Sequence, residues 1–421
     1  MISDYKPLLA NSRFRYIWAS QILSQLTINI TNFLLLTRLF EETGSSIATS
    51  FLWVVYALPA IFIGPFAAAS VDMVSKRKML MVTNLLQSLV IFGYAFLHQT
   101  SLFLLFGVAL AYSFLNQFYV PAEASTIPEV VPKAKLPLAN SLFFLTQQSS
   151  VILGFGFAGI LKQFLGFDRT LFLLAFFLFL AFLSTTFLPQ MRPEQVIPKK
   201  FEEAIVKFFE RIMEGYVFIR DHKRVLAPFV LLLGVQIAVA ITAVNVPLMA
   251  KDLFNIPLNS AGVIIVVPTG VGAILGALIS SNLLKKGWRK KRVIDTFLAF
   301  TSFCGFMLVF VVPQLGPALR VFGGIIVIIL AAMSLVGTII PAQTYLQEAT
   351  PGGLRGRVFG NFWFLATIAT IFPVILSGTV AELFGIRLLV FILSGFALAG
   401  LIFSKRKGDE LIQNELQNEK I

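Results

Sequence analysis

Long runs of apolar residues alternate with short polar segments along almost the whole chain. Each run holds about twenty residues, the length that an α-helix needs to cross the hydrocarbon core of a bilayer. Because backbone groups in lipid must hydrogen-bond within their own segment, each run is interpreted as one spanning helix. The pattern predicts an all-α membrane protein with twelve transmembrane helices, at 16–38, 47–71, 79–97, 102–121, 140–162, 170–188, 225–249, 260–284, 293–312, 317–345, 358–381 and 386–403.

The basic residues of the chain gather in alternate loops. Of the 34 Lys and Arg residues, 28 fall in the two tails and the even-numbered loops, and 6 fall on the odd-numbered side. Since basic residues accumulate on the cytoplasmic side, we expect both termini inside a cell membrane, plasma or inner. The net charge of +13 then reflects topology, with anionic lipid as its neighbour, and nucleic acid is not an expected partner.

The two halves of the chain share local patterns at an offset close to 220 residues. The pair Pro121-Ala122 corresponds to Pro341-Ala342, and the segment 164–166 corresponds to 383–385. We therefore expect two six-helix halves related by pseudo-two-fold symmetry. The predicted divisions are an N-terminal half at 1–188, a cytoplasmic linker at 189–224, a C-terminal half at 225–403 and a cytoplasmic tail at 404–421.

The predicted linker carries apolar residues at helical spacing between Phe201 and Ile219, with Lys207, Arg211 and Arg220 in or beside this stretch. This spacing predicts an amphipathic helix that lies on the inner membrane surface. A helix that binds a partner protein is the alternative.

The loop after the second predicted span carries a recognisable motif. In the major facilitator superfamily this loop follows a Gly-x-x-x-Asp-Arg-x-Gly-Arg-Arg pattern, which the chain resembles in Asp72 and the basic cluster at 76–78, while both glycines and the first arginine are replaced. Within the superfamily the chain is similar to the drug-efflux group that includes macrolide and enterobactin exporters, on the segments 43–46, 127–131 and 355–359. Lysophospholipid transporters are similar over much of the same length.

The resemblance implies that these loops form a gating latch at the inner ends of the helices. Asp72 would meet a helix N-terminus, whose dipole favours an anion, in the outward-open state. The alternative is that the basic loops only anchor the topology. The residues expected in the latch are Asp72, Lys76, Arg77, Glu129, Arg355 and Arg357.

Uncharged polar residues occur deep in several predicted spans, where they are costly in lipid and usually face the interior of the bundle. The resemblance implies that the first, fourth, seventh and tenth spans line a substrate cavity. Hydrogen bonding between helices is the alternative role for each of these residues. The expected lining is Gln25, Asn29, Asn32, Tyr112, Asn116, Tyr119, Gln236, Asn245, Gln343 and Tyr345.

No Asp or Glu lies near the middle of a predicted span. Proton-driven antiporters commonly use an embedded carboxylate, because burial lets it load and release protons. The candidates for proton coupling are Asp72 and Glu123, with Asp295 as a third, all expected near the inner surface. Many antiporters of the superfamily carry a proline in the fifth span where this chain has Phe155, so the direction of transport is left open.

The chain offers no constellation for catalysis or for a cofactor. Its two histidines, His98 and His222, fall in predicted loops, and its one cysteine, Cys304, lies in an apolar run. The sequence lacks a nucleophile with its base, a metal-ligand cluster and a phosphate-binding loop. We therefore expect that the protein is neither an enzyme nor an ATP-driven pump, and that it binds neither a metal nor a cofactor.

The sequence as a whole predicts a secondary active transporter that exports amphipathic or hydrophobic, drug- or macrolide-like molecules by alternating access, with proton coupling implied by the resemblance. A lysophospholipid or siderophore transporter is the alternative within transport. A non-transporting membrane sensor or assembly partner is the alternative of another class. The expected partners are a small-molecule substrate and the lipid bilayer, and the resemblance implies a monomer.

Overall fold

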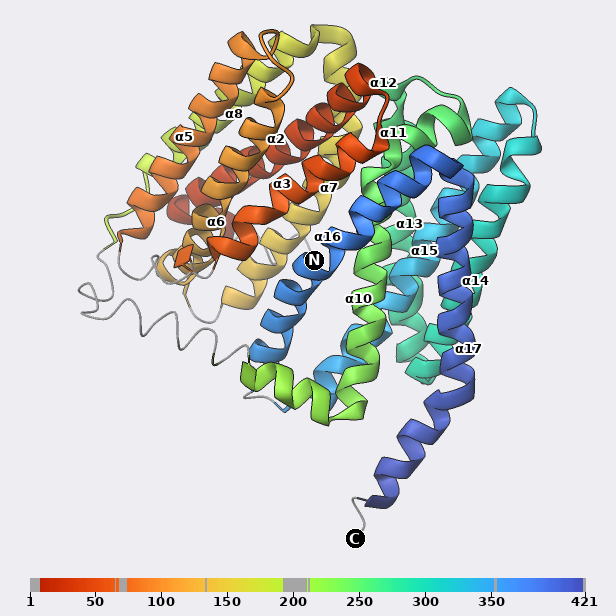
Figure 1. Ribbon diagram of the computed structural model, residues 1–421. Coiled ribbons are helices and arrows are strands. Elements are labelled where there is room, and N and C mark those ends of the chain that lie inside the picture. Colours follow the sequence, from red (N-terminus) through yellow and green to blue (C-terminus); the bar gives the residue numbers. More distant parts are fainter. Residues whose placement is uncertain are drawn as a thin grey trace. The chain divides into compact units, whose positions relative to one another are not determined.

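The computed structural model describes residues 8–64, 66–67, 74–132, 135–191, 210, 213–351 and 354–418, with the backbone alone at 137, 355–357 and 406–418. Within these ranges the regular secondary structure is entirely helical (Figure 1). The chain folds into two compact units, one of Met1–Gly44 with Phe51–Phe208 and one of Ser45–Ser50 with Phe209–Ile421.

In the first unit, helix α2 packs against α6, α7 and α8, and α5 packs against α6 and α8. The polar side chains of α2 therefore lie where three helices meet. The described helices of this unit are α2 (Ser12–Thr43), α3 (Ser46–Phe62, from Phe51 onward), α5 (Lys76–Leu97), α6 (Leu104–Val130), α7 (Leu136–Leu165) and α8 (Phe167–Thr186).

In the second unit, α15 packs against α13 and α14, α14 packs against α17, and α10 packs against α15 and α16. Two π-helical segments, η2 and η3, interrupt the regular helices. The described elements are α10 (Lys223–Val244), α11 (Val246–Leu248), η2 (Met249–Phe254), α12 (Leu258–Ala261), η3 (Gly262–Val266), α13 (Val267–Lys285), α14 (Lys290–Phe310), η4 (Val312–Gln314), α15 (Pro317–Ala349), α16 (Arg355–Phe384) and α17 (Ile386–Asn418).

The same helix pairs recur within the two units. Taken in chain order, the pairs α5 with α6, α5 with α8 and α2 with α7 of the first unit have counterparts in α14 with α15, α14 with α17 and α10 with α16 of the second. Each unit thus repeats one packing pattern. The predicted pseudo-two-fold relation between the halves, and their boundaries at 188 and 225, stay predictions.

A glycine that ends one helix and starts the next explains one of the repeated sequence patterns. Gly166, between α7 and α8, has φ 82° and ψ 169°, and Gly385, between α16 and α17, has φ 84° and ψ 156°. This backbone region is open essentially to glycine alone. The repeated segments 164–166 and 383–385 therefore mark the same sharp turn in each unit.

Ten helices in the described ranges are long and apolar enough to cross a membrane. Helix α3 is shorter, with 17 residues. Helix α2 is long enough, with 32 residues, but Ser20, Gln21, Ser24 and Thr27 lie on its buried side and lower its apolar character. The chain is thus a multi-pass membrane protein, and the number twelve stays a prediction.

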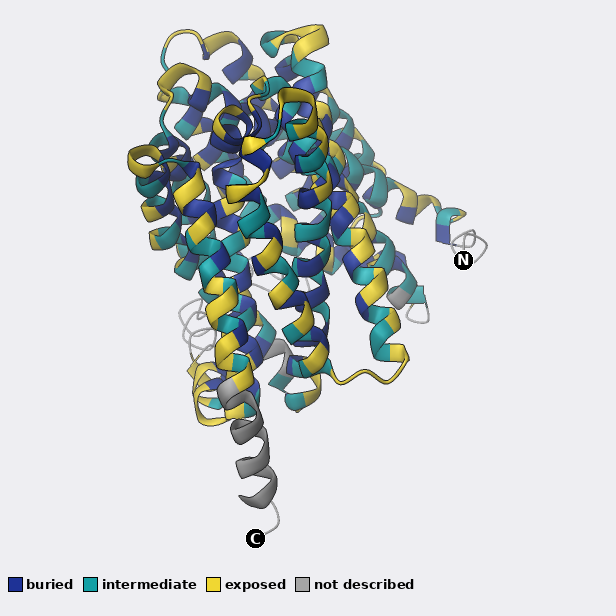
Figure 2. Cartoon of the chain, turned by 90° about the vertical axis from the view of Figure 1, so that its right-hand side faces the viewer, coloured by how far each residue is buried: buried dark blue, intermediate teal, exposed yellow. Residues whose placement is uncertain are grey.

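Large apolar side chains are exposed along these helices, as Leu278, Phe372 and Phe396 illustrate with exposed fractions of 63%, 72% and 71%. Figure 2 shows exposed and buried residues alternating along the same helices. A water-soluble protein rarely exposes so much contiguous apolar surface, whereas lipid tails solvate it.

Helix α6 differs from its predicted extent. The prediction ended the fourth span at 121, whereas α6 continues to Val130 with Pro121 and Pro128 inside it. Proline is tolerated within membrane helices because neighbouring groups satisfy the freed carbonyls. Glu123 therefore lies within a long helix rather than in a loop after it.

The first turn of α3 belongs with the second unit. The Ser45 hydroxyl and the Ile47 N–H donate to Glu382 Oε2 of α16, at 2.6 and 3.1 Å. Gly378 lets the segment approach, since a Cβ there would lie 2.3 Å from Ser50 Oγ. Glu382 thus satisfies a free N–H at the start of α3, as an N-cap does.

The predicted amphipathic linker helix falls largely on 192–209 and 211–212, outside the described residues. The described part is helical from 213 to 221. In this part Ile219 is buried against Val225 and Phe229, while Met213 and Tyr216 are exposed. That arrangement is amphipathic, and its placement on a membrane surface stays a prediction.

Candidate functional site

A buried carboxylate lies inside the first unit. Glu123 of α6 is 7% exposed, and its Oε1 accepts a hydrogen bond of 2.7 Å from the hydroxyl of Tyr119, one helical turn earlier. Within the described residues Glu123 forms no ion pair. A buried charge without a cationic partner is costly, which distinguishes this carboxylate from those paired at the surface.

The Tyr119 hydroxyl connects Glu123 to two other helices. Ser24 of α2 donates to the Tyr119 oxygen at 3.0 Å, and Ser20 of α2 lies 3.3 Å from the same oxygen. The amide of Asn84, on α5, donates to Ser20 Oγ at 3.0 Å. One hydrogen-bonded network therefore joins α2, α5 and α6 through a single phenol.

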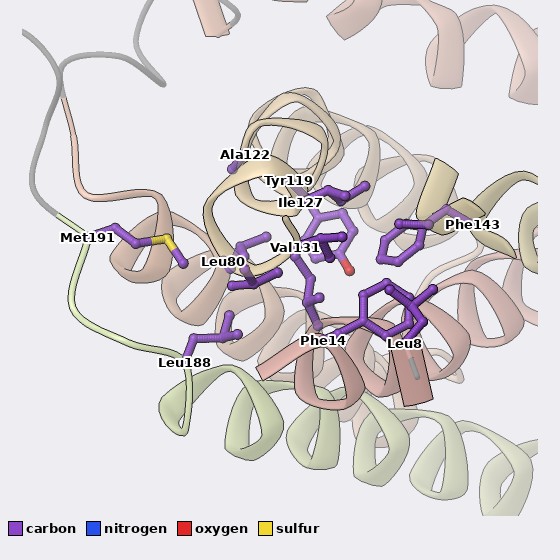
Figure 3. Close-up of a cluster of buried hydrophobic side chains, with 13 residues drawn as sticks. Leu8, Phe14, Leu80, Tyr119, Ala122, Ile127, Val131, Phe143, Leu188 and Met191 are labelled. Carbon is purple, nitrogen blue, oxygen red and sulfur yellow. The ribbon is translucent and has the colours of Figure 1, made fainter. Parts of the chain in front are cut away.

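Apolar side chains close this network off from water. Figure 3 shows the Tyr119 ring within a cluster that includes Leu80, Phe14 and Phe143, with the hydroxyl oxygen pointing toward the side where the two phenylalanines lie. Tyr119 is 1% exposed. Hydrogen bonds in such a low-dielectric setting are stronger than in water, and an unmet polar group costs more.

Several buried polar atoms on α2 and α5 have no hydrogen-bond partner among the described residues. They are Oε1 of Gln21, Oδ1 of Asn84, both side-chain polar atoms of Gln87, and the hydroxyls of Thr27 and Thr31. Buried polar groups are normally satisfied by protein or by internal water. The interior of the first unit is thus polar over several helical turns.

Two of the predicted latch residues pair within the first unit. Lys76 Nζ lies 3.2 Å from Glu129 Oε1, which joins the start of α5 to the end of α6. Arg77 donates to the backbone oxygen of Thr186 at the end of α8. Glu129 also lines a surface hollow of about 490 Å³.

The remaining latch residues cannot be placed with them. Asp72 lies outside the described residues. Arg355 and Arg357 lie in the first turn of α16, where only the backbone is described. The latch stays a prediction.

The predicted cavity residues of the first unit divide into two groups. Gln25, Asn29, Asn32 and Asn116 are half-buried, whereas Tyr112 and Tyr119 are buried. Asn29 Nδ2 donates to the Gln25 backbone oxygen at 2.7 Å, and α7 packs closely on Asn29, since a Cβ at Gly154 would lie 2.5 Å from its Cβ.

In the second unit Gln236, Gln343 and Tyr345 are half-buried. Asn245 is 1% exposed at the C-terminal end of α10, and its Nδ2 donates to the backbone oxygen of Ile241 and to Ser377 Oγ on α16, at 2.9 and 3.1 Å. Asn245 thus hydrogen-bonds α10 to α16. A role of these residues in lining a cavity stays a prediction.

Sequence reasoning missed Ser20, Ser24 and Asn84. A signal was present, since Ser20, Ser24, Thr27 and Thr31 recur at spacings of four, three and four residues on one face of α2. Small polar residues are so common between membrane helices that this spacing alone does not single them out.

His98 was predicted to lie in a loop, and it is in fact a buried C-terminal cap of α5. Its Nε2 lies 2.6 Å from Asp168 Oδ1 at the start of α8. Within the described residues no group of three His, Cys, Asp or Glu side chains is placed to hold a metal ion.

Comparison with known proteins shows relatives along most of the chain. The family model of the Major Facilitator Superfamily matches residues 17–373. An MFS-type transporter, YfiS of Bacillus subtilis, is 25% identical and covers 91% of this chain and 90% of its own length. Macrolide efflux protein A of Streptococcus pyogenes is 24% identical, and the match covers 89% of this chain and 91% of that protein. Multidrug resistance protein MdtG of Escherichia coli is also 24% identical, and the match covers 86% of this chain and 85% of that protein.

Solved structures show the same fold. The POT family transporter PepTSo has a TM-score of 0.71 at 13% identity and covers 96% of this chain and 99% of its own. The nucleoside transporter NupG has a TM-score of 0.64 at 15% identity, covering 92% and 97%. Members of this family are transporters rather than enzymes, and they handle small molecules within a bilayer. The chain belongs to the Major Facilitator Superfamily.

Proposed function

We propose that this protein is a secondary active transporter that exports amphipathic or hydrophobic small molecules by alternating access. The relatives that support this proposal include a macrolide efflux protein and a multidrug resistance protein, each matched over most of its length. At about 25% identity the substrate does not transfer from a relative. Export of drug-like molecules is our choice because the candidate lining is polar but uncharged, which suits a largely apolar substrate.

The proposal places the protein in a cell membrane as twelve helices in two pseudo-symmetric halves, 1–188 and 225–403, joined by a cytoplasmic linker. The distribution of basic residues supports cytoplasmic termini, with 28 of 34 Lys and Arg residues on that side. In the proposal the protein works as a monomer.

Substrate is proposed to bind among the uncharged polar side chains of α2, α6, α10 and α15. Of these, Gln25, Asn32, Asn116, Gln236 and Gln343 are half-buried and so retain surface for a ligand. The proposed latch, with the Lys76–Glu129 pair as its described part, closes the inner ends during the cycle.

Glu123 is proposed to carry the coupling proton. The observation that carries this step is its burial within α6, beside the Tyr119 hydroxyl and without a cationic partner among the described residues. Uptake of a proton removes a costly buried charge, and its release restores one, so the two forms of Glu123 favour different packing around α6. Asp72 is the second candidate.

The test is the accumulation of hydrophobic dyes and macrolides in cells that express the protein, with and without a protonophore. We expect lower accumulation than in cells without the protein, and we expect the protonophore to abolish the difference. Glu123→Gln keeps the shape but not the titration, so export is expected to fall to the level of cells without the protein.

Glu42→Gln is the matched control, because Glu42 is exposed and pairs with Arg38 at the other end of the first unit, away from Glu123. Its export should equal that of the wild type. Full protonophore-sensitive export by Glu123→Gln would exclude Glu123 as the coupling group. No effect of the wild type on any dye or macrolide would refute drug export and leave lysophospholipid transport as the function to test.

A further inference from the structure

The hydrogen bonds around Tyr119 have a fixed direction when Glu123 is ionised. The single proton of the Tyr119 hydroxyl is donated to Glu123 Oε1. The contact of 3.3 Å between Ser20 and Tyr119 is then a donation from Ser20, and Ser24 donates as well. With the Asn84 amide donating to Ser20, the donors of three helices point toward one carboxylate.

Ser24 has a second acceptor within reach, and this gives the network an alternative state. Its hydroxyl lies 3.3 Å from the backbone oxygen of Gln21, one turn earlier on α2. When Glu123 holds a proton, it can donate to Tyr119, Tyr119 can donate to Ser24, and Ser24 can turn to Gln21. The added proton forms an O–H bond on Glu123 and stays there, while the hydroxyls of Tyr119 and Ser24 keep their protons and only reorient.

The two states hold the helices together with different strength. Hydrogen bonds to an ionised carboxylate are roughly twice as strong as bonds between neutral groups. The bond to the carboxylate lies within α6, and it polarises the Tyr119 oxygen that accepts from Ser20 and Ser24 on α2. Proton uptake by Glu123 reduces this polarisation and so weakens the hydrogen bonds between α6 and α2.

We infer that the Tyr119 hydroxyl transmits the protonation state of Glu123 from α6 to α2. Tyr119 is a positioning residue in this role, and the inference rests on the proposed function, in which Glu123 carries the coupling proton. Since α2 carries the half-buried residues Gln25 and Asn32 farther along, the change reaches the helix that is proposed to hold substrate.

Among the described residues, no charged side chain of α2, α5 or α7 forms a hydrogen bond or ion pair with Glu123. Tyr119 is the titratable side chain that faces Glu123 from its own helix, and α2 and α5 present the uncharged Ser20, Ser24 and Asn84. Lys76 of α5 and Glu129 of α6 form an ion pair with each other. Glu129 lies about 9 Å farther along α6 at 1.5 Å per residue.

The decisive variant is Tyr119→Phe, which keeps the ring and removes the hydroxyl. The rate of dye transport is measured in proteoliposomes as a function of pH, for this variant and for the wild type. Loss of the donor destabilises ionised Glu123, so we expect the midpoint of the pH profile to move toward alkaline pH by about one unit. Tyr94→Phe is the matched control, because Tyr94 is a buried tyrosine on α5 that belongs to no proposed site, and it is expected to leave the profile in place.

Ser24 gives an independent arm that does not alter a buried ring. Ser24→Ala removes one donor to Tyr119, so we expect the midpoint of the pH profile to shift in the same direction by a smaller amount. Ser24→Thr keeps the hydroxyl, so its midpoint should equal that of the wild type. The pH at which the infrared band of the protonated carboxyl group appears should shift most in Tyr119→Phe, less in Ser24→Ala and not at all in Ser24→Thr.

The outcomes separate this inference from the function on which it rests. A proton-dependent wild type with an unshifted profile in Tyr119→Phe and Ser24→Ala would overturn the inference and leave the proposed function intact. A wild type whose transport ignores both pH and protonophore would overturn the proposed function itself.

Discussion

At the scale of single residues, one carboxylate and several hydroxyl groups organise the interior of the first unit through hydrogen bonds. Tyr119 hydrogen-bonds Glu123, and two serines hydrogen-bond Tyr119, so among the described residues neutral hydroxyl groups rather than a cation position this carboxylate. Sequence reasoning named both ends of this chain of contacts, Glu123 as a candidate for proton coupling and Tyr119 as an expected cavity residue, and both roles stay predictions. It could not connect them to Ser20 and Ser24, because contacts between α2 and α6 depend on packing across about 95 residues of chain.

Gly166 offers a test of backbone conformation at one residue. With φ 82° and ψ 169°, an alanine there is strained by about 1–3 kcal/mol. We expect Gly166→Ala to lower the thermal unfolding midpoint measured in detergent. Gly93→Ala is the control, since Gly93 lies inside α5 with no atom within 4 Å of an added Cβ, and its midpoint should stay level or rise. Equal midpoints for Gly166→Ala and wild type would contradict the strain argument.

At the scale of elements, the existence of a long helix follows from its apolar run: ten helices in the described ranges are long and apolar enough to cross a membrane, and the count of twelve stays a prediction. The sequence could not supply where helices end, since the fourth span was predicted to end at 121 and α6 continues to Val130 with Pro121 and Pro128 inside it. The reason is physical: in a membrane bundle the freed carbonyls find other donors, so proline loses its value as a stop signal.

Helices α13 and α15 approach closely at two glycines four residues apart. A Cβ at Gly272 would lie 2.2 Å from the backbone oxygen of Ile329, and one at Gly276 would lie 2.2 Å from that of Met333. Small residues at such spacing let membrane helices pack backbone to backbone.

Gly276→Ala should therefore force the two helices apart and cost about 1–3 kcal/mol or more. The yield of monodisperse protein in fluorescence size-exclusion chromatography is expected to fall. Gly234→Ala on α10 serves as the comparison, since an added Cβ there meets no atom within 4 Å. If Gly276→Ala and Gly234→Ala gave the same yield as wild type, the close approach of α13 and α15 would not limit stability.

At the scale of the whole molecule, the chain is a multi-pass membrane protein of the Major Facilitator Superfamily, and the orientation of its termini is a prediction from charge alone. The only native cysteine, Cys304, is buried and can be replaced by alanine to give a cysteine-free background. Single cysteines can then report which side of the membrane each loop occupies.

We expect Thr100→Cys, an exposed position between α5 and α6, to react with a membrane-impermeant maleimide in intact cells. Asp221→Cys, an exposed position just before α10, should react only after the cells are permeabilised. The reverse pattern would invert the predicted topology, and labelling of both positions in intact cells would contradict a single orientation.

The polar face of α2 also bears on how the protein is made. Ser20, Gln21, Ser24 and Thr27 are buried on α2, which packs against α6, α7 and α8, and all three of these helices leave the ribosome after it. A nascent α2 alone in the bilayer would present these groups to lipid tails, which is unfavourable. Its release from the insertion machinery is therefore expected to wait for its partners, so that the first unit is assembled as a group of helices rather than one helix at a time.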